Sequence, residues 1–381
     1  MVKNILITGG AGFIGSRLSL QLIQKGYSVT VLDCLHPQIH GKNPELHSPL
    51  YLSIKDKVHF IKGDVTHKED WKKALQNQHI IVHLAAETGT GQSMYEIERY
   101  TTVNVTGTAI LLDYLTNENH TIEKVVIASS RAVYGEGKYF SKKSNQYFYP
   151  ADRKEIDLQN GIFELKNPTD EEEFLTLVAT DEQSKIQPKS IYGLTKYHQE
   201  QSLMICCQSL NIPCVAFRYQ NVYGPGQSLT NPYTGILSIF STRIKQQKSI
   251  NIFEDGKESR DFVFIDDVVK ATLLGIENAA ANFNIFNVGT GVATSVLEVA
   301  KALMKNYEIE VPLEISGQYR KGDIRHNFAD INLIQSTLGF TPSIDFETGI
   351  RQFCEWVNEQ TLAEDLYEKS LEEMKEKGLL K

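Results

Sequence analysis

The sequence predicts an α/β fold in which a doubly wound parallel sheet is joined to a smaller, mixed α/β lobe. Two observations carry this prediction. In the first half of the chain, short runs of β-branched and aliphatic residues alternate with longer stretches of helical character. The runs are apolar at consecutive positions, which is typical of parallel strands covered by helices on both faces. The second half mixes short helical and strand-like segments, which favours the smaller lobe.

Each strand of the predicted sheet corresponds to one apolar run. Five runs occur in the first part of the chain, at residues 4–7, 28–32, 58–61, 80–84 and 125–128. A sixth strand is expected at 213–218. The run at 283–288 has the same character, and we expect it to return late to the same sheet.

A glycine-rich turn, Thr-Gly-Gly-Ala-Gly-Phe-Ile-Gly at residues 8–15, follows the first predicted strand and opens a helical pattern. Gly9 permits the tight turn, Gly12 lets backbone amides approach a pyrophosphate, and Gly15 lets the helix and strand pack closely. The N-terminus of the helix also favours the bound anion. The turn therefore predicts a Rossmann-type dinucleotide site.

Two carboxylates follow the next strands. Asp33 ends the second strand, close to the expected distance for a carboxylate that accepts hydrogen bonds from an adenosine ribose. It would repel a 2′-phosphate, and no arginine directly follows it, so NAD is favoured over NADP. After the third strand, Asp64 can meet the adenine amino group and Val65 can pack on the ring. The alternative is that Asp64 is a plain turn residue.

These signals divide the chain into three parts. Residues 1–222 are expected to form the NAD-binding Rossmann domain, 223–360 the smaller lobe, and 361–381 a charged helical tail. A polar stretch at about 136–188 interrupts the first part, where a compact domain would use a short loop. We interpret it as a solvated excursion or a lid.

Composition narrows the classes of partner. A net charge of −8 argues weakly against a nucleic-acid-binding surface. The apolar runs fall short of a membrane span, and the chain starts directly with a strand, which leaves no room for a cleavable leader. We therefore expect a cytoplasmic protein. Its five cysteines match neither a disulfide framework nor a zinc site, so no metal is expected.

The predicted reaction centre combines a phenol, an ammonium and a hydroxyl. Tyr192 and Lys196 lie four residues apart, on one face of a predicted helix. The ammonium and the charge of a nicotinamide would lower the pKa of the phenol, so that a tyrosinate could act as a base near neutral pH. Ser130 ends a predicted strand, where such sheets bind ligands, and would orient the substrate hydroxyl.

With these motifs in view, the chain resembles the nucleotide-sugar epimerase/dehydratase family of extended short-chain dehydrogenases/reductases almost end to end. The resemblance also rests on His83-Leu-Ala-Ala, Ser129-Ser, Arg218-Tyr-x-Asn-Val-Tyr-Gly-Pro and Arg260-Asp-Phe-Val. Four further motifs look most like the dTDP-L-rhamnose 4-epimerase subgroup: Gln92-Ser-Met-Tyr-Glu, Ser130-Arg-Ala-Val-Tyr-Gly-Glu-Gly, Asn231-Pro-Tyr-Thr-Gly and Gly322-Asp-Ile-Arg-His.

The resemblance implies catalytic roles for Ser130, Tyr192 and Lys196 and a nucleotide-diphosphate sugar as substrate. The residues implied to contact NAD are Gly9, Gly12, Phe13, Ile14, Gly15, Asp33, Asp64, Val65, Leu84, Ala85, Ala86, Lys196 and Tyr219. Those implied to hold the nucleotide and its diphosphate are Asn221, Asn231, Arg260, Arg320 and Asp323. The guanidinium groups would fork onto phosphate oxygens, although either arginine could instead form a structural ion pair.

The chain departs from the family pattern at two places. Arg131 and Ala132 stand where the 4,6-dehydratases of the family carry an Asp–Glu pair, so elimination of water is disfavoured. Gln220 replaces an aromatic residue that is often found at its position. The favoured interpretation is an NAD-dependent 4-epimerase that oxidises and re-reduces C4 of dTDP-L-rhamnose or another dTDP- or UDP-hexose.

Three alternatives remain open: a nucleotide-sugar oxidoreductase or 4-ketoreductase, a 4,6-dehydratase, and a non-catalytic NAD-sensing or scaffold protein on the same fold. We also expect a homodimer. The predicted helices near 103–115 and 192–210 carry apolar residues on more than one face, as if each packs on the sheet and on a partner. In relatives, these helices pair into a four-helix bundle.

Overall fold

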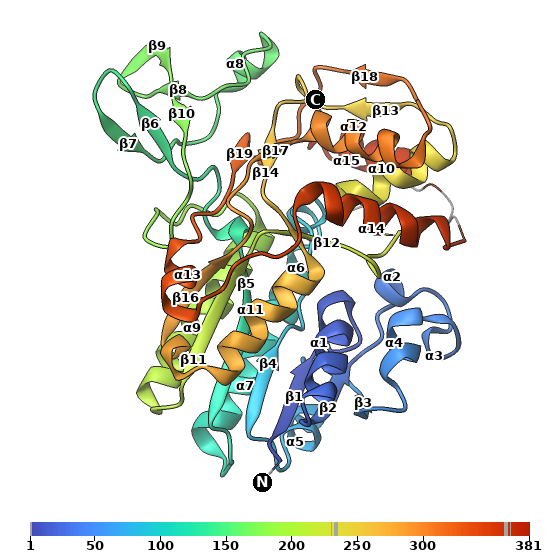
Figure 1. The fold of residues 1–381 in the computed structure, drawn as a ribbon. Coiled ribbons are helices and arrows are strands. Elements are labelled where there is room, and N and C mark those ends of the chain that lie inside the picture. Colours follow the sequence, from blue (N-terminus) through green and yellow to red (C-terminus); the bar gives the residue numbers. More distant parts are fainter. Residues whose placement is uncertain (1, 230, 232–234, 362–364, 366) are drawn as a thin grey trace.

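The computed structural model describes residues 2–229, 231, 235–361, 365 and 367–381, and seven parallel strands form its central sheet (Figure 1). Their order is β16-β11-β5-β4-β1-β2-β3. The strands are β1 (Asn4–Thr8), β2 (Ser28–Asp33), β3 (His59–Lys62), β4 (Ile80–His83), β5 (Lys124–Ser130), β11 (Cys214–Tyr219) and β16 (Asn284–Val288). The predicted α/β fold with a parallel sheet is confirmed. The strand order reverses between β1 and β4, and in such sheets ligands bind beside this reversal, at the carboxyl ends of the strands.

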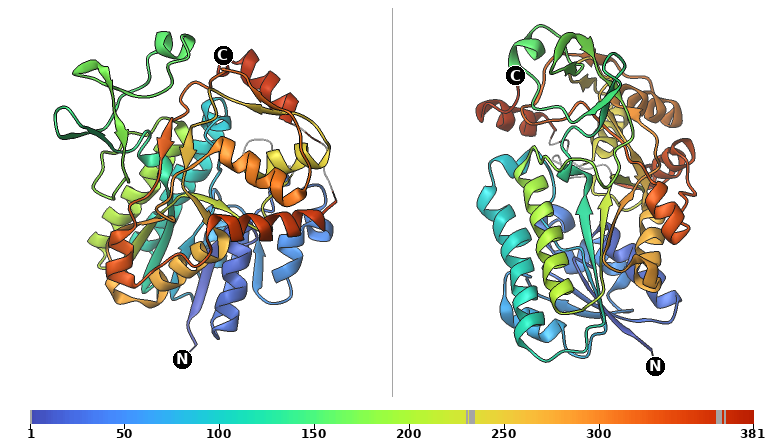
Figure 2. Two further views of the ribbon diagram at one scale, coloured as in Figure 1. Left: turned by 45° about the horizontal axis from the view of Figure 1, so that its top comes forward. Right: turned by 90° about the vertical axis from the view of Figure 1, so that its left-hand side faces the viewer.

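Helices cover both faces of the sheet, which explains why its strands are apolar at consecutive positions. One face packs against α1 (Phe13–Gln24) and α11 (Ile265–Glu277), where Leu18, Leu22 and Val268 are fully buried. The other face packs against α5 (Lys68–Ala74), α7 (Gly107–Asn117) and α9 (Ile191–Ser209). Figure 2 (right) shows α7 and α9 side by side. Burial of each large aliphatic side chain contributes about 1.5–3 kcal/mol to these packed layers.

The last strand of the sheet comes from far along the chain. β16 pairs with β11 in parallel, with Val215 opposite Asn284 and Tyr219 opposite Val288. This is the apolar run that the sequence placed in the sheet as a late strand. Residues beyond 222 therefore help to build the domain that carries the glycine-rich turn.

The second lobe packs over the carboxyl end of the sheet (Figure 1). Its longer helices are α10 (Ile236–Lys245), α12 (Val296–Tyr307) and α14 (Phe346–Asn358). Short strand pairs connect them: β12 (Asn221–Tyr223) with β15 (Phe262–Phe264), β13 (Ile250–Ile252) with β18 (Leu313–Ile315), and β14 (Ser259–Arg260) with β17 (Thr294–Ser295) and β19 (His326–Asn327). Short helices elsewhere are α2 (Pro37–His40), α3 (Pro44–His47), α4 (Pro49–Ile54), α6 (Ile97–Tyr100) and α13 (Asn332–Leu338).

The tail forms the helix α15 (Tyr367–Glu376), as its apolar spacing predicts. Tyr367, Leu371 and Met374 are buried and pack with Ile239 and Phe253 of the second lobe. No helix within the described part of the chain is long and apolar enough to cross a membrane.

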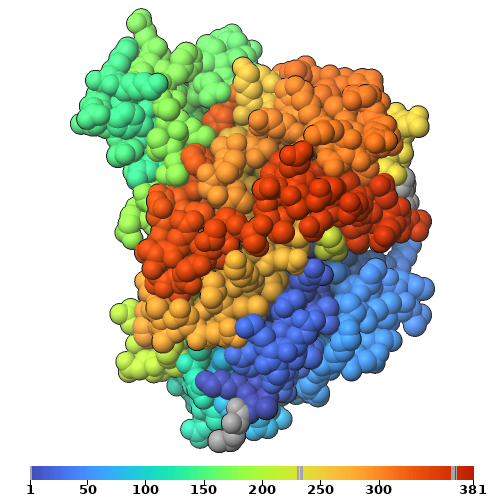
Figure 3. Space-filling view, in the orientation of Figure 1, coloured from blue at the N-terminus to red at the C-terminus, as the bar shows by residue number. Residues whose placement is uncertain are grey.

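The polar stretch at 136–188 is a small folded unit and not a loop. It contains β6 (Tyr139–Ser141), β7 (Gln146–Phe148), α8 (Glu155–Gln159), β8 (Lys166–Asn167), β9 (Asp170–Phe174) and β10 (Thr176–Leu177). Tyr139, Leu165 and Leu175 form its own small core. It projects from the body at the upper left in Figure 3. The sequence did not reveal these strands because they are short and largely polar.

Candidate active site

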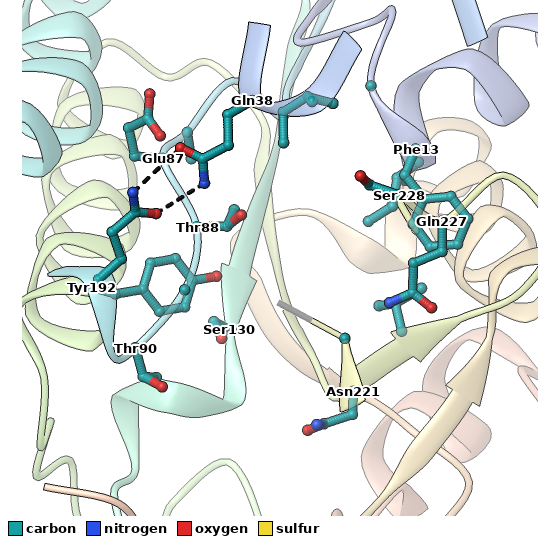
Figure 4. Close-up of a pocket in the computed structure, with 18 of the residues that line it drawn as sticks. Phe13, Gln38, Glu87, Thr88, Thr90, Ser130, Tyr192, Asn221, Gln227 and Ser228 are labelled. Carbon is teal, nitrogen blue, oxygen red and sulfur yellow. Dashed lines mark hydrogen bonds between the residues drawn. The ribbon is translucent and has the colours of Figure 1, made fainter. Parts of the chain in front are cut away.

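A cleft of about 1050 Å³ lies between the two lobes, at the carboxyl ends of the parallel strands. Residues that end or follow β1, β2, β4, β5 and β11 form one wall. The other wall comes from the second lobe and the tail helix, and includes Phe253, Arg260 and Leu371. Figure 4 shows Tyr192 and Ser130 on one side of this space, with Phe13 and Gln227 on the opposite side.

The glycine-rich turn has no room for side chains. Gly9 has a φ of +67°, and a Cβ atom there would lie 2.9 Å from the backbone nitrogen of Ala85. A Cβ atom at Gly15 would lie 2.6 Å from the Cα atom of Gly10. Gly12 precedes α1 and offers no side-chain cap, so the first amides of the helix are left for another acceptor. Such a helix N-terminus suits a phosphate group.

Asp33 supports this turn directly. Its two carboxylate oxygens accept hydrogen bonds from the backbone nitrogens of Ala11 at 2.9 Å and Leu35 at 2.8 Å. Burial raises the pKa of Asp33, while these amides and nearby His40 oppose that rise. Asp33 lines the cleft, as expected for a ribose-binding carboxylate.

Asp64 has a turn role as well as a place in the cleft. Its Oδ1 atom accepts hydrogen bonds from the backbone nitrogen and hydroxyl of Thr66, both at 2.8 Å. That geometry is the plain turn considered as the alternative. Asp64 and the buried Val65 nevertheless both line the cleft, as do Leu84, Ala85 and Ala86 after β4.

Ser130 and Tyr192 meet at the centre of the cleft. Ser130 is the last residue of β5, and Tyr192 lies in the first turn of α9, whose N-terminus is capped by Ser190. The Tyr192 hydroxyl points toward Ser130 (Figure 4). Burial raises the pKa of the Tyr192 phenol, whereas hydrogen bonding with Ser130 and the charge of Arg131 lower it.

Lys196 lies one helical turn beyond Tyr192 and lines the same cleft. Its Nζ atom donates to Oε1 of Gln199 at 2.7 Å, and burial lowers its pKa to about 7. That Lys196 and a bound nicotinamide together lower the pKa of Tyr192 stays a prediction. The charge of Arg131, which stands out in the sequence only as a departure from the dehydratase pattern, also lowers the pKa of the phenol.

A buried ion pair fixes α9 against the sheet. Glu200 of α9 accepts hydrogen bonds from Arg218 of β11 at 2.6 and 2.9 Å, and from the Ser129 hydroxyl of β5 at 2.6 Å. Arg218 is 3% exposed and Glu200 is 0% exposed. One carboxylate thus joins the helix that carries Tyr192 to the strand that carries Ser130.

Among the residues expected to hold the nucleotide, the two arginines already have carboxylate partners. Arg260 and Arg320 both line the cleft, but both donate to the carboxylate of Asp323, at 3.0 and 2.7 Å. Nη1 of Arg260 also donates to two backbone carbonyl groups. These ion pairs have the geometry that was considered as the alternative, and a role of the two arginines in binding a diphosphate stays a prediction.

The two asparagines differ in position. Asn221 lines the cleft, and its Oδ1 atom accepts a hydrogen bond from Nε of Arg131 at 3.0 Å. Asn231 is 2% exposed, lies outside the lining of the cleft, and accepts from Nε2 of Gln38 at 3.4 Å. Tyr219 lines the cleft at the end of β11, and its hydroxyl lies 2.7 Å from that of Thr272.

A polar network in the cleft was missed from the sequence. Gln38, after β2, exchanges hydrogen bonds with Gln92 at 2.9 and 3.3 Å. Arg99 donates to Glu87 at 2.6 Å and to Glu96 at 2.7 Å. The only available signal was the motif that begins at Gln92, because the pairing joins segments 54 residues apart.

Comparison with known proteins agrees with this architecture. The model of the NAD dependent epimerase/dehydratase family matches residues 5–153 and 170–289. The chain is 37% identical over 360 residues to the dTDP-L-rhamnose 4-epimerase of Burkholderia thailandensis, covering 94% of this chain and 96% of that protein.

Two solved structures share the fold. The UDP-glucose 4-epimerase of Thermotoga maritima with UDP-glucose has a TM-score of 0.74 and 28% identity, covering 93% of this chain and 98% of that one. The Thermus thermophilus UDP-glucose 4-epimerase complex with NAD has a TM-score of 0.72 and 25% identity, covering 94% of this chain and 100% of that one. The long match to the family model and the 37% identity to a relative aligned over nearly its whole length show that this chain belongs to the NAD-dependent epimerase/dehydratase family.

Proposed function

We propose that this protein is an NAD-dependent nucleotide-sugar 4-epimerase, with dTDP-L-rhamnose as the first substrate to test. The observation that carries the proposal is the Ser130–Tyr192 pair at the end of β5, in a cleft that continues to the glycine-rich turn. The similarity to the Burkholderia thailandensis enzyme supports the choice of sugar. The lobe at 223–360 would then bind the nucleotide sugar.

The residues of the cleft fit NAD. A Cβ atom at Gly9 or Gly15 would clash with the neighbouring backbone, and the first amides of α1 have no side-chain cap. A pyrophosphate site requires both this close backbone packing and free amides. Asp33 faces the cleft and would repel a 2′-phosphate. We therefore assign the pyrophosphate to the turn and the adenosine ribose to Asp33, with Lys196 and Tyr219 toward the nicotinamide end.

The proposed reaction leaves the sugar with its C4 configuration inverted. Bound NAD supplies a hydride acceptor that later returns the hydride to C4. Tyr192 takes the proton of the C4 hydroxyl, and Ser130 orients that hydroxyl by hydrogen bonding. The resulting 4-keto sugar rotates within the cleft, so that the hydride returns to the opposite face of C4. Tyr192 then gives the proton back to the C4 oxygen. There is no net redox change, so the cofactor must stay bound.

Arg131 and Ala132 favour epimerisation over dehydration. A 4,6-dehydratase needs an acid for the departing 6-hydroxyl and a base for C5, and neither of these side chains can serve in either role. A 6-deoxy sugar such as rhamnose has no 6-hydroxyl to lose. The remaining rival is an oxidoreductase that uses the same residues but exchanges its cofactor.

The test is turnover of dTDP-L-rhamnose by the purified protein without added NAD, with the C4 epimers resolved by NMR. We expect epimerisation without release of a ketone. Tyr192→Phe removes the base and should lower turnover by about 10²–10⁴-fold or more, with folding and NAD binding kept. Activity of Tyr192→Phe within threefold of the parent would contradict the assignment. Accumulation of NADH with a free ketone would favour the oxidoreductase, and a 4-keto-6-deoxy product from an intact hexose the dehydratase.

We also propose a cytoplasmic homodimer. Two large apolar side chains on the outer face of α9, Leu194 and Ile205, are 53% and 66% exposed, and Ile97 on α6 is 50% exposed. Exposed apolar side chains gathered on neighbouring helices are typical of a protein interface. A two-fold pairing of α7 and α9 with their copies would cover them.

A further inference from the structure

Four arginines of the described chain line the cleft, and three of them are paired with carboxylates. Arg99 pairs with Glu87 and Glu96, while Arg260 and Arg320 share Asp323. Arg131 is the exception, because no carboxylate of a described residue forms an ion pair with it. A cation held in a cleft without a counter-ion has lost part of its hydration and favours the arrival of an anion.

The guanidinium of Arg131 is fixed at one end and open at the other. Nε donates to Oδ1 of Asn221 at 3.0 Å, which holds the plane of the group. No described residue accepts a hydrogen bond from its Nη groups. A guanidinium anchored through Nε presents its two Nη groups as a fork, which matches the paired oxygens of a phosphate or carboxylate.

The position of Arg131 places this fork beside the reacting group. Arg131 directly follows Ser130, and its charge acts on the Tyr192 phenol. Arg260 and Asp323 line the same cleft, and their charges both act on Arg131. Arg131 thus interacts electrostatically with both the Tyr192 phenol and the second-lobe ion pair.

We propose that Arg131 is a specificity-determining residue that binds an anionic oxygen pair of the nucleotide sugar next to the C4 hydroxyl. This inference rests on the proposed function, because it assumes that a nucleotide sugar occupies the cleft. Two groups of such a ligand have this chemistry: the phosphate nearest the sugar, and a carboxylate on the sugar itself. Both accept two hydrogen bonds from one guanidinium.

The experiment compares ligand binding by the NAD-loaded wild type, Arg131→Met and Arg131→Lys. Methionine keeps much of the length without the charge, and lysine keeps the charge without the fork. The probes, measured by calorimetry, are dTMP, dTDP, dTDP-L-rhamnose, UDP-glucose and UDP-glucuronate. Loss of a charge-assisted pair should raise the Kd by about 10- to 100-fold in Arg131→Met. Arg131→Lys should recover part of that loss.

The probes separate the two sources of the anion. If the phosphate is bound, Arg131→Met weakens dTDP and all three nucleotide sugars but leaves dTMP unchanged. If a sugar carboxylate is bound, the substitution weakens UDP-glucuronate alone. Either pattern supports the proposal. Changes below twofold for every probe, in a variant with the melting temperature of the wild type, would overturn it.

The same measurements separate this inference from the proposed function. A wild type that binds the probes tightly but turns over no sugar would refute the epimerase, while the comparison of variants would still decide the role of Arg131. A wild type that binds none of the probes would overturn both. If Arg131→Met does not fold, Arg131→Lys decides, because the loss of the fork alone should still raise the Kd severalfold for the same probes.

Discussion

The buried pair of Glu200 and Arg218 allows a quantitative test of how the site is held. Glu200→Ala removes a carboxylate that accepts four hydrogen bonds and leaves the Arg218 guanidinium charged, 3% exposed and without its counter-ion. Arg218 keeps only its neutral acceptors, the Tyr134 hydroxyl and the Glu182 carbonyl. Breaking one side of such a pair costs about 3–5 kcal/mol of folding free energy. The midpoint of urea unfolding, followed by circular dichroism, should fall accordingly.

A matched control isolates burial as the cause. Lys3 and Glu123 form an ion pair with the same N···O distance of 2.6 Å, but both side chains are 51% exposed. Glu123→Ala should therefore cost less than about 1 kcal/mol. The double variant Glu200→Leu/Arg218→Met, which replaces the pair by apolar groups, should recover much of the loss. The reasoning fails if Glu200→Ala is no more destabilising than Glu123→Ala.

Three other predictions follow from single groups. The pKa of Lys196 falls from 10.5 to about 7 in the folded chain, so the unfolded chain binds more protons between these values and stability rises with pH across that window. Lys196→Met should therefore melt at a higher temperature than the wild type at pH 6, and the difference should be smaller at pH 9. The variant should show no turnover. A melting temperature below that of the wild type at pH 6 would contradict the lowered pKa of Lys196. Asp33→Ala should narrow the preference for NAD over NADP, measured as the ratio of the two Kd values, and equal binding of both cofactors by the wild type would show that Asp33 does not discriminate. Light scattering at micromolar concentration should give a dimer that Leu194→Glu/Ile205→Glu shifts toward the monomer, whereas a monomeric wild type would rule out the proposed interface.

The sequence predicts the sheet well for a physical reason. Continuous apolar runs can be satisfied only by strands buried on both faces, and this held even for the late strand at 284–288. Ser130 could be placed at the ligand-binding edge of the sheet because it ends a parallel strand, and the carboxyl ends of parallel strands meet at that edge. Each of these inferences needs only the local pattern and the direction of the strands.

Side-chain partners were harder to predict. A guanidinium in a nucleotide-binding motif can bind a phosphate or a neighbouring carboxylate equally well. The carboxylate partner of Arg260 could not be identified from the sequence, because Asp323 lies 63 residues away along the chain. The choice between these partners depends on distances that only the fold sets. The same is true of Gln38 and Gln92, and of the strands at 139–177, whose polar sequence resembles that of a loop.

The late arrival of β16 limits how this chain can be cut into parts. β11 is buried at all six positions and pairs with β5 on one side and with β16 on the other. A fragment that ended at residue 222 would leave one side of β11 as a bare apolar edge, which is a template for aggregation. Failure of that fragment to stay in solution would therefore reflect a missing strand and not a weak domain. Any separately produced NAD-binding domain has to include residues 284–288, although much of the second lobe precedes them in the sequence.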